Sequence, residues 1–114
     1  MQIKVAIVGL GKMGISHLSI LNALDAFNVK AMCDSSRMVG KVLEKYSGIS
    51  FVEDYTRLLE LSDLDAVVIS TPTALHTTMV RAALERGLHV FCEKPLTLSG
   101  EQANELAALA ESKG

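Results

Sequence analysis

Short apolar runs alternate along the chain with segments of helical periodicity. The runs are rich in β-branched residues and are bounded by glycine or polar residues, which is typical of strands. They cover residues 3–8, 28–33, 50–52, 65–70 and 88–92. Apolar residues recur at helical spacing between and after them, which predicts helices over about residues 12–24, 39–46, 54–61, 75–86 and 99–114.

Two of these helices have an apolar face that can be listed from the spacing. On the first helix the face is expected to comprise Met13, Leu18, Leu21 and Leu24. On the second it is expected to comprise Val39, Val42, Leu43 and Tyr46. These positions lie on one side of a helix, so both faces are expected to pack inward.

Glycine and polar residues mark the ends of the predicted helices. Gly48 and Gly87 follow the second and fourth helices and are expected to end them. Asp54 is expected to cap the short third helix. Ser99 and Gln102 have the spacing of a capping box at the start of the last helix.

The alternation of strands and helices predicts an α/β fold. Apolar strands separated by helices form a parallel sheet that is covered on both faces, and right-handed crossovers make that sheet doubly wound. We expect the Rossmann-type strand order 3-2-1-4-5, in a sheet truncated before a sixth strand. Residues 1–114 are expected to form one domain, without a repeat, a linker or a low-complexity tract.

Composition and charge exclude several classes of protein. The chain has 114 residues, 49% of them hydrophobic, and a formal net charge of −2. Its basic residues are scattered, so we expect no binding to nucleic acid. We expect no signal peptide, and the apolar runs are too short to cross a membrane. A cytoplasmic protein is expected.

The two cysteines, Cys33 and Cys92, are expected to be buried reduced thiols. Their spacing matches no metal motif, so we expect no metal site. In the expected strand order they lie three strands apart, roughly 14 Å at ~4.8 Å per strand. That separation excludes a disulfide within the chain.

A glycine-rich loop lies directly between the first strand and the first helix. The segment VGLGKMG places Gly9, Gly11 and Gly14 in a G-x-G-x-x-G motif, with Leu10, Lys12 and Met13 between them. Such glycines allow a tight turn, the approach of a pyrophosphate and close helix packing, while the helix N-terminus faces the phosphates. The motif predicts a dinucleotide-binding loop; the alternative is a tight turn that binds no ligand.

The residues after the second strand bear on the choice of cofactor. Asp34 lies 20 residues after Gly14, where an acid can accept hydrogen bonds from the adenosine ribose, which favours NAD over NADP. Ser35, Arg37 and Lys12 are donors or cations of the kind that a 2′-phosphate needs. We therefore predict NAD and leave NADP open. Arg37 has the further alternative of a solvated residue in the first turn of a helix.

The second half of the site is expected at the tips of the fourth and fifth strands, because ligands in such sheets lie across the carboxyl ends of the strands. At the fourth strand the candidates are Ser70, Thr71, Pro72, Thr73 and His76. Thr71 or Thr73 can instead cap a helix, and His76 can instead pack on the loop. At the fifth strand the candidates are Glu93 and Lys94, which can alternatively form a solvated ion pair.

These motifs, in this order, resemble one family. G-x-G-x-x-G-x-x-H from Gly9 to His17, the acid Asp34, T-P-T-x-x-H from Thr71 to His76, and Glu93-Lys94-Pro95 follow one another along the chain. Together they resemble the N-terminal NAD(P)-binding domain of the glucose–fructose oxidoreductase/inositol dehydrogenase/MocA family. The resemblance covers the whole chain, and Glu93-Lys94-Pro95 is its most specific part.

The resemblance implies roles for several of these residues. Lys94 would be the catalytic residue, close to the nicotinamide and the substrate, and Glu93 would lie against the nicotinamide ribose. His17 would pack behind the glycine loop, and the Lys94–Pro95 bond would often be cis. The implied reaction is hydride transfer between a nicotinamide cofactor and a sugar-like or polyol-like hydroxyl or carbonyl group.

The resemblance also implies a part that this sequence does not contain. In the family, the substrate pocket and the main acid/base residues come from a C-terminal domain. We therefore expect the N-terminal domain of a longer dehydrogenase, catalytically incomplete alone, with exposed apolar surface on the last two strands and the last helix and a capacity to form homo-oligomers. The alternatives are a stand-alone NAD(P)-binding sensor or subunit without turnover, and a domain that binds no nucleotide.

Overall fold

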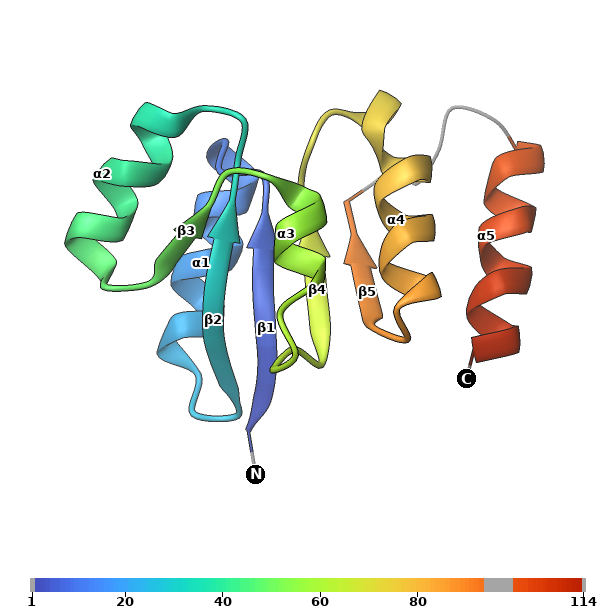
Figure 1. Ribbon diagram of the computed structural model, residues 1–114, viewed down its shortest axis with the longest axis horizontal. Helices are drawn as coiled ribbons and strands as arrows, with labels where there is room; N and C mark the ends of the chain where they lie inside the picture. The colour runs from blue at the N-terminus through green and yellow to red at the C-terminus, as the bar shows by residue number, and fades with distance from the viewer. Residues whose placement is uncertain (1, 94–99, 114) are drawn as a thin grey trace.

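Five parallel strands form one sheet in the computed structural model, which describes residues 2–93 and 100–113 (Figure 1). The strands are β1 Ile3–Val8, β2 Phe27–Cys33, β3 Ser50–Val52, β4 Ala66–Ile69 and β5 His89–Cys92. Their order is β3-β2-β1-β4-β5. This confirms the predicted Rossmann-type order, and all four neighbouring pairs are parallel.

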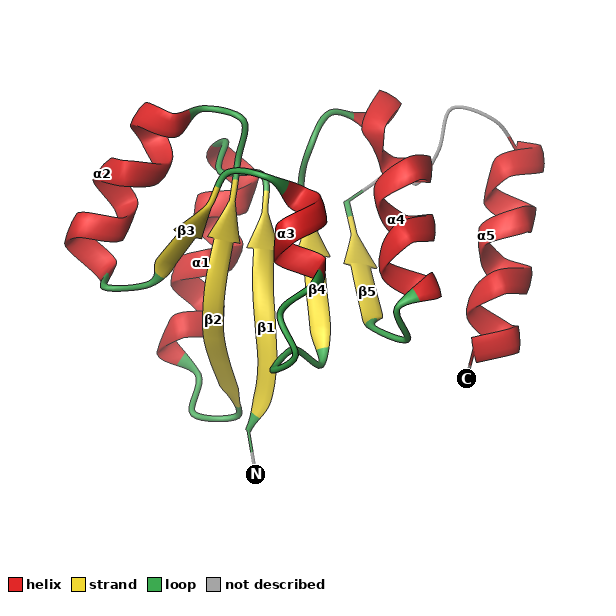
Figure 2. Cartoon of the chain, viewed as in Figure 1, coloured by secondary structure: helices red, strands yellow, loops and turns green. Residues whose placement is uncertain are grey.

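The helices lie on both faces of the sheet (Figure 2). They are α1 Lys12–Ala23, α2 Arg37–Ser47, α3 Tyr55–Leu59, the 3₁₀ turn η1 Thr73–Leu75, α4 His76–Glu85 and α5 Gly100–Lys113. Buried residues of α1 and packed residues of α2 cover one face, while buried residues of α3, α4 and α5 lie on the other. The fold is therefore doubly wound, as predicted.

The central strand β1 shows why the apolar runs are continuous. Val5 and Ile7 pack under α1, whereas Ala6 and Val8 pack on the opposite side, under α3 and α4. All four are at most 1% exposed. Successive side chains of a strand point to opposite faces, so both faces of β1 are core. Burial of each larger side chain contributes about 1.5–3 kcal/mol.

The predicted helix ends are confirmed where the structure describes them. Asp54 accepts a hydrogen bond from the Thr56 amide at 2.9 Å and caps α3. Gly48, with φ of 75°, ends α2, and Gly87, with φ of 79°, follows the last turn of α4. Ser99 lies outside the described residues. The fourth helix differs from its prediction because it begins as the 3₁₀ turn η1, in which the Leu75 amide donates to the Pro72 carbonyl.

The predicted apolar face of α1 is wrong at its two ends. Met13 is 50% exposed and Leu24 is 47% exposed, whereas Leu18 is buried and Leu21 is half-buried. Met13 lies in the first turn of α1, beside the glycine loop, where the helix has reached the edge of the sheet. Leu24 is the residue at which α1 ends, so it has left the helix face. Helical spacing alone does not tell how far the sheet extends beneath a helix.

The predicted face of α2 is wrong at Val42 and Tyr46, which are exposed. The helix instead meets β3 through Gly40, because a Cβ atom on this glycine would overlap the ring of Phe51. That close approach leaves room only for flanking side chains, and Val39 and Leu43 are half-buried against the core. A glycine carries no hydrophobic signal, so the contact could not be predicted from periodicity.

Both cysteines are free thiols, as predicted; Cys33 is buried as expected, whereas Cys92 is only half-buried. Burial, followed by the charge of Asp34, raises the pKa of Cys33 to about 11. Burial likewise raises the pKa of Cys92 to about 11. Both thiols therefore stay protonated and unreactive at neutral pH. None of the helices in the described part of the chain is sufficiently long and apolar to cross a membrane.

Candidate dinucleotide-binding site

Two glycines of the loop are fixed by the fold itself. Gly9 has a positive φ of 95°, and a Cβ there would lie 2.8 Å from the Ser70 backbone. Its amide donates to the Cys33 carbonyl at 2.8 Å, which ties the loop to the end of β2. A Cβ on Gly14 would overlap the Gly9 carbonyl, so α1 crosses the loop at backbone contact. Both glycines are required whether or not a ligand binds.

Gly11 is different because no protein atom requires it. Its φ of −75° suits any residue, and nothing lies within 4 Å of the position that a Cβ would take. It is the N-cap of α1, where no side chain accepts a hydrogen bond from the first turn. The start of this helix is thus an open cradle that a side chain would fill. A phosphate group fits such a helix N-terminus.

A cavity of about 620 Å³ opens in front of this cradle. It crosses the carboxyl ends of β1, β2, β3 and β4, which is where a doubly wound sheet binds its ligand. Its volume is that of a cofactor site. The lining residues are Val8, Gly9, Gly11, Lys12, Met13, Cys33, Asp34, Ser35, Glu53, Tyr55, Ser70, Thr71, Pro72, Leu75 and Met79.

Asp34 both lines the cavity and holds the glycine loop. Its Oδ2 atom accepts a hydrogen bond from the Leu10 amide at 2.6 Å, and its Oδ1 atom accepts one from the Ser36 amide at 2.7 Å. Each carboxylate oxygen keeps a further lone pair, so the group can still accept hydroxyl donors from a ribose. Leu10 itself is 3% exposed and packs in the core, so it takes part through its backbone.

Of the three side chains considered as partners for a 2′-phosphate, the structure places two at the cavity and one outside it. Lys12 and Ser35 line the cavity, as Asp34 does. Arg37 is the first residue of α2, is exposed and does not contribute to the cavity wall.

At the tip of β4, Ser70 and Thr71 line the cavity together with Pro72. The Ser70 hydroxyl is buried and has no hydrogen-bond partner among the described residues, which is a polar atom that a ligand can satisfy. Thr71 donates its hydroxyl to the Met79 sulfur at 3.4 Å. Thr73 lines a different, polar hollow between α4 and α5, away from this cavity.

His76 packs against the turn that follows β4. Its side chain is 1% exposed, and its Nε2 atom is 2.7 Å from the Thr71 carbonyl oxygen. His76 is not among the residues that line the cavity, and its burial is consistent with the packing role considered for it. It supports the turn that presents Thr71 and Pro72.

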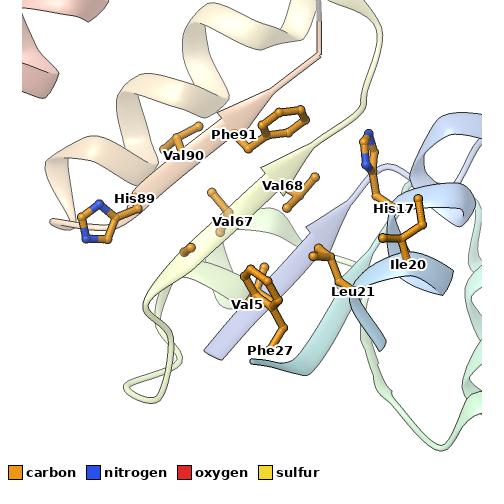
Figure 3. A pocket seen from close by; sticks show the side chains of 11 residues that line it. Val5, His17, Ile20, Leu21, Phe27, Val67, Val68, His89, Val90 and Phe91 are labelled. Carbon is orange, nitrogen blue, oxygen red and sulfur yellow. The ribbon is translucent and has the colours of Figure 1, made fainter. Parts of the chain in front are cut away.

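Glu93 follows β5 and bonds to α1. Its amide donates to the Ile69 carbonyl at 3.0 Å, which continues the β4–β5 ladder by one residue. Its carboxylate Oε1 pairs with the His17 Nε2 atom, and the His17 ring meets the Phe91 ring edge-on with centroids 5.4 Å apart (Figure 3). Lys94, the predicted catalytic residue, and Pro95 lie outside the described residues.

Several cavity residues were missed from the sequence. Glu53 follows β3 as Asp34 follows β2, so the rule that the carboxyl ends of strands line the site would have found it. Tyr55 and Met79 carry no motif; they meet because the Tyr55 hydroxyl donates to the Met79 carbonyl at 2.7 Å. Burial raises the pKa of Tyr55, so this hydroxyl stays protonated. Leu75, Cys33 and Val8 complete the wall.

A second, apolar cavity of about 330 Å³ lies beside α1, over β4 and β5 (Figure 3). We call it the apolar hollow; its lining residues are Val5, His17, Ile20, Leu21, Phe27, Ala66, Val67, Val68, His89, Val90 and Phe91. At this hollow Phe91 is 53% exposed. Exposed apolar surface was predicted on β4, β5 and the last helix. The structure confirms it on β5, at Phe91, but not on β4, where Val67, Val68 and Ile69 are buried, nor at any large hydrophobic residue in the described part of α5.

The chain is similar to several characterised oxidoreductases. Residues 3–114 match the family described as "Oxidoreductase family, NAD-binding Rossmann fold". The scyllo-inositol 2-dehydrogenase (NAD(+)) of Bacillus subtilis is 33% identical over 121 residues, which cover 99% of this chain and 34% of that protein.

Solved structures agree with the family match. KijD10, a 3-ketoreductase from Actinomadura kijaniata in complex with NADP and TDP-benzene, superposes with a TM-score of 0.92 at 33% identity, covering 99% of this chain and 35% of that one. GenD2 from gentamicin A biosynthesis, in complex with NAD, gives 0.95 at 32% identity, covering 99% and 32%. The chain spans about a third of the length of these proteins. It belongs to the glucose–fructose oxidoreductase/inositol dehydrogenase/MocA family of oxidoreductases and forms its NAD-binding Rossmann domain.

Proposed function

We propose that this cavity binds the nicotinamide dinucleotide of a longer oxidoreductase that acts on a sugar-like or polyol-like substrate. The observation that carries the proposal is the open cradle at Gly11, because the fold has no need of a glycine there whereas a bound pyrophosphate does. The similar proteins support the substrate class, since they include an inositol dehydrogenase and a 3-ketoreductase.

Different residues of the cavity would bind different parts of the cofactor. The cradle at Gly11 and the Lys12 side chain would hold the pyrophosphate, and Asp34 with Ser35 would hold the adenosine ribose. The Ser70 hydroxyl and Thr71 would face the second nucleoside, over β4. When bound, the dinucleotide gives or accepts the hydride. The protein contributes binding, orientation and the exclusion of water.

We propose NAD as the preferred cofactor. Asp34 holds a carboxylate at the cavity wall through two backbone hydrogen bonds, so it cannot turn away from a 2′-phosphate. The Asp34 carboxylate and a 2′-phosphate are both negative and would repel each other, whereas two ribose hydroxyls can donate hydrogen bonds to the carboxylate oxygens. Paired calorimetric titrations with NADH and NADPH test this, and tighter binding of NADPH would contradict it.

We also propose that residues 1–114 are the N-terminal domain of that longer protein, with Lys94 as its catalytic residue. Hydride transfer needs a positioned proton donor or acceptor as well as the cofactor. The coverage of about a third of each relative supports the proposal. So does the apolar hollow, because parallel sheets are normally covered on both faces. Two free thiols suit the reducing cytoplasm, where we place the protein.

The intact mass of the protein in its source cell tests the domain proposal. A mass close to three times the 12.3 kDa of this chain is expected. A mass equal to 12.3 kDa would overturn it and would favour a stand-alone binding module instead.

A further inference from the structure

His17 and Glu93 connect two elements that are far apart in the sequence. His17 lies on α1, one turn after Gly14, and Glu93 follows β5. His17 lines the apolar hollow together with Phe91 of β5 (Figure 3). Its side chain also pairs with that of Glu93. The contact therefore links the helix that carries the glycine loop to the strand that carries the Glu-Lys-Pro segment.

Both the backbone and the side chain of Glu93 are held by other residues. Its backbone is fixed because the amide donates to the Ile69 carbonyl in the β4–β5 ladder. Its side chain is 27% exposed and is engaged by the His17 imidazole, which is 21% exposed. The imidazole in turn packs edge-on against the Phe91 ring. The His17 ring is itself held by Phe91, so its N–H group comes from a fixed direction. A partly buried carboxylate that accepts such a hydrogen bond has one preferred orientation.

The position of this carboxylate relates it to the cofactor cavity. Ile69, the backbone partner of Glu93, directly precedes Ser70 and Thr71, which line that cavity. Asp34, on the adenosine side, follows β2, which is two strands away from β4 and three from β5. With the pyrophosphate at the glycine loop over β1, the second nucleoside extends over β4 toward β5. Glu93 is not among the residues that line the cavity, but it follows the strand next to Ser70 and Thr71, on the side toward which the nicotinamide half would extend.

We propose that His17 is a positioning residue for that half: its imidazole holds the Glu93 carboxylate in place to accept hydrogen bonds from the nicotinamide ribose. This inference rests on the proposed function. It gives His17 a role in addition to packing behind the glycine loop. Without the imidazole donor, the carboxylate would rotate toward solvent, and the ribose hydroxyls would lose a preorganised acceptor.

Calorimetric titration of four chains with NADH and with ADP tests the proposal. The chains are the wild type, His17→Phe, Glu93→Gln and the double variant. His17→Phe keeps a ring against Phe91 but removes the donor. NADH binding is expected to weaken about tenfold in each single variant, the size of one hydrogen bond to a charged group, and no further in the double variant. ADP lacks the nicotinamide ribose, so its affinity is expected to be unchanged.

Two further variants separate the donor from the ring. His17→Gln keeps an N–H donor and is expected to restore most of the NADH affinity. His89→Phe is the matched control, because His89 lines the same hollow at the opposite end of β5, and its NADH affinity is expected to equal that of the wild type. Thermal melts establish that each variant is folded, and His17→Leu replaces His17→Phe if the latter is not.

The outcomes distinguish this inference from the function on which it rests. Wild-type NADH affinity in the donorless His17 variant would overturn the inference, as would additive losses in the double variant. So would a His17→Gln chain that binds NADH as weakly as the donorless variant. If the wild-type chain bound neither NADH nor ADP, the proposed function itself would fail.

Discussion

At the scale of single residues, the glycine loop separates what folding needs from what binding needs. Gly9 and Gly14 are surrounded by backbone atoms of Ser70 and of the loop itself, so any side chain there would displace the main chain. Gly11 faces the open cavity and has a backbone conformation that alanine also adopts. The same residue type therefore serves packing at two positions and ligand approach at the third.

Alanine substitutions at Gly11 and Gly14 should have opposite effects. Gly11→Ala is expected to leave the free energy of unfolding within about 0.5 kcal/mol of wild type, because the new methyl group meets no atom. The same methyl group would crowd the pyrophosphate and is expected to weaken NADH binding by at least about tenfold. Gly14→Ala is expected to lower the free energy of unfolding by about 1–3 kcal/mol or more. Urea denaturation and NADH titration measure the two effects; unchanged NADH affinity in Gly11→Ala would contradict the cradle.

Asp34 is expected to combine a structural and a selective role. Asp34→Ala leaves the Leu10 and Ser36 amides without their acceptor, at a cost of about 1–3 kcal/mol in the free energy of unfolding if water does not replace it. It also removes the charge that faces a 2′-phosphate, so the ratio of NADH to NADPH affinity should fall toward one. Glu53→Ala is the matched control, because Glu53 lines the same cavity after β3. Equal relaxation of the preference in both variants would show that net charge, rather than a ribose contact, sets it.

At the scale of elements, the sequence predicts what depends on chain order and misses what depends on side-chain packing. Strand order follows from five apolar runs joined by right-handed crossovers, and the G-x-G-x-x-G spacing places the loop at the end of β1. The orientation of a side chain depends on its neighbours instead. His76 has the spacing of a site residue but is buried against the Thr71 carbonyl, and Glu93 is turned toward α1 by His17. Neither of these two contacts can be predicted from the periodicity of apolar residues.

The packing of α5 on α4 offers a test of which contacts hold an element in place. Leu106 is 2% exposed in the core beneath α5, whereas its neighbour Glu105 forms a 3.0 Å ion pair with Arg81 at the surface. Leu106→Ala is expected to lower the free energy of unfolding by about 2–5 kcal/mol. Glu105→Ala is expected to lower it by less than about 1 kcal/mol, because exposed ion pairs contribute little. Urea denaturation of both variants measures the two losses, and a loss in Glu105→Ala as large as that in Leu106→Ala would contradict the prediction.

At the scale of the whole molecule, the two faces of the sheet are unequally covered. One face carries α3, α4 and α5, and the other carries α1 and α2, which pack on β1, β2 and β3 and on part of β4. The remaining surface over β4 and β5 forms the apolar hollow, beside which Phe91 and Ile20 are more than half exposed. Apolar surface of this kind normally meets another protein surface. In the 114-residue chain by itself, a second copy can supply it.

Self-association through the apolar hollow is therefore expected for the isolated chain. Light scattering should give a mass above 12.3 kDa that rises with concentration. Ile20→Glu places a charge in the hollow at a side chain that is 59% exposed, so it should leave folding intact and return the mass to 12.3 kDa. Met38→Glu is the matched control, since Met38 is 77% exposed on α2, outside the hollow. Continued association of the Ile20→Glu chain, or equal loss of association in Met38→Glu, would show that the copies do not meet through this face.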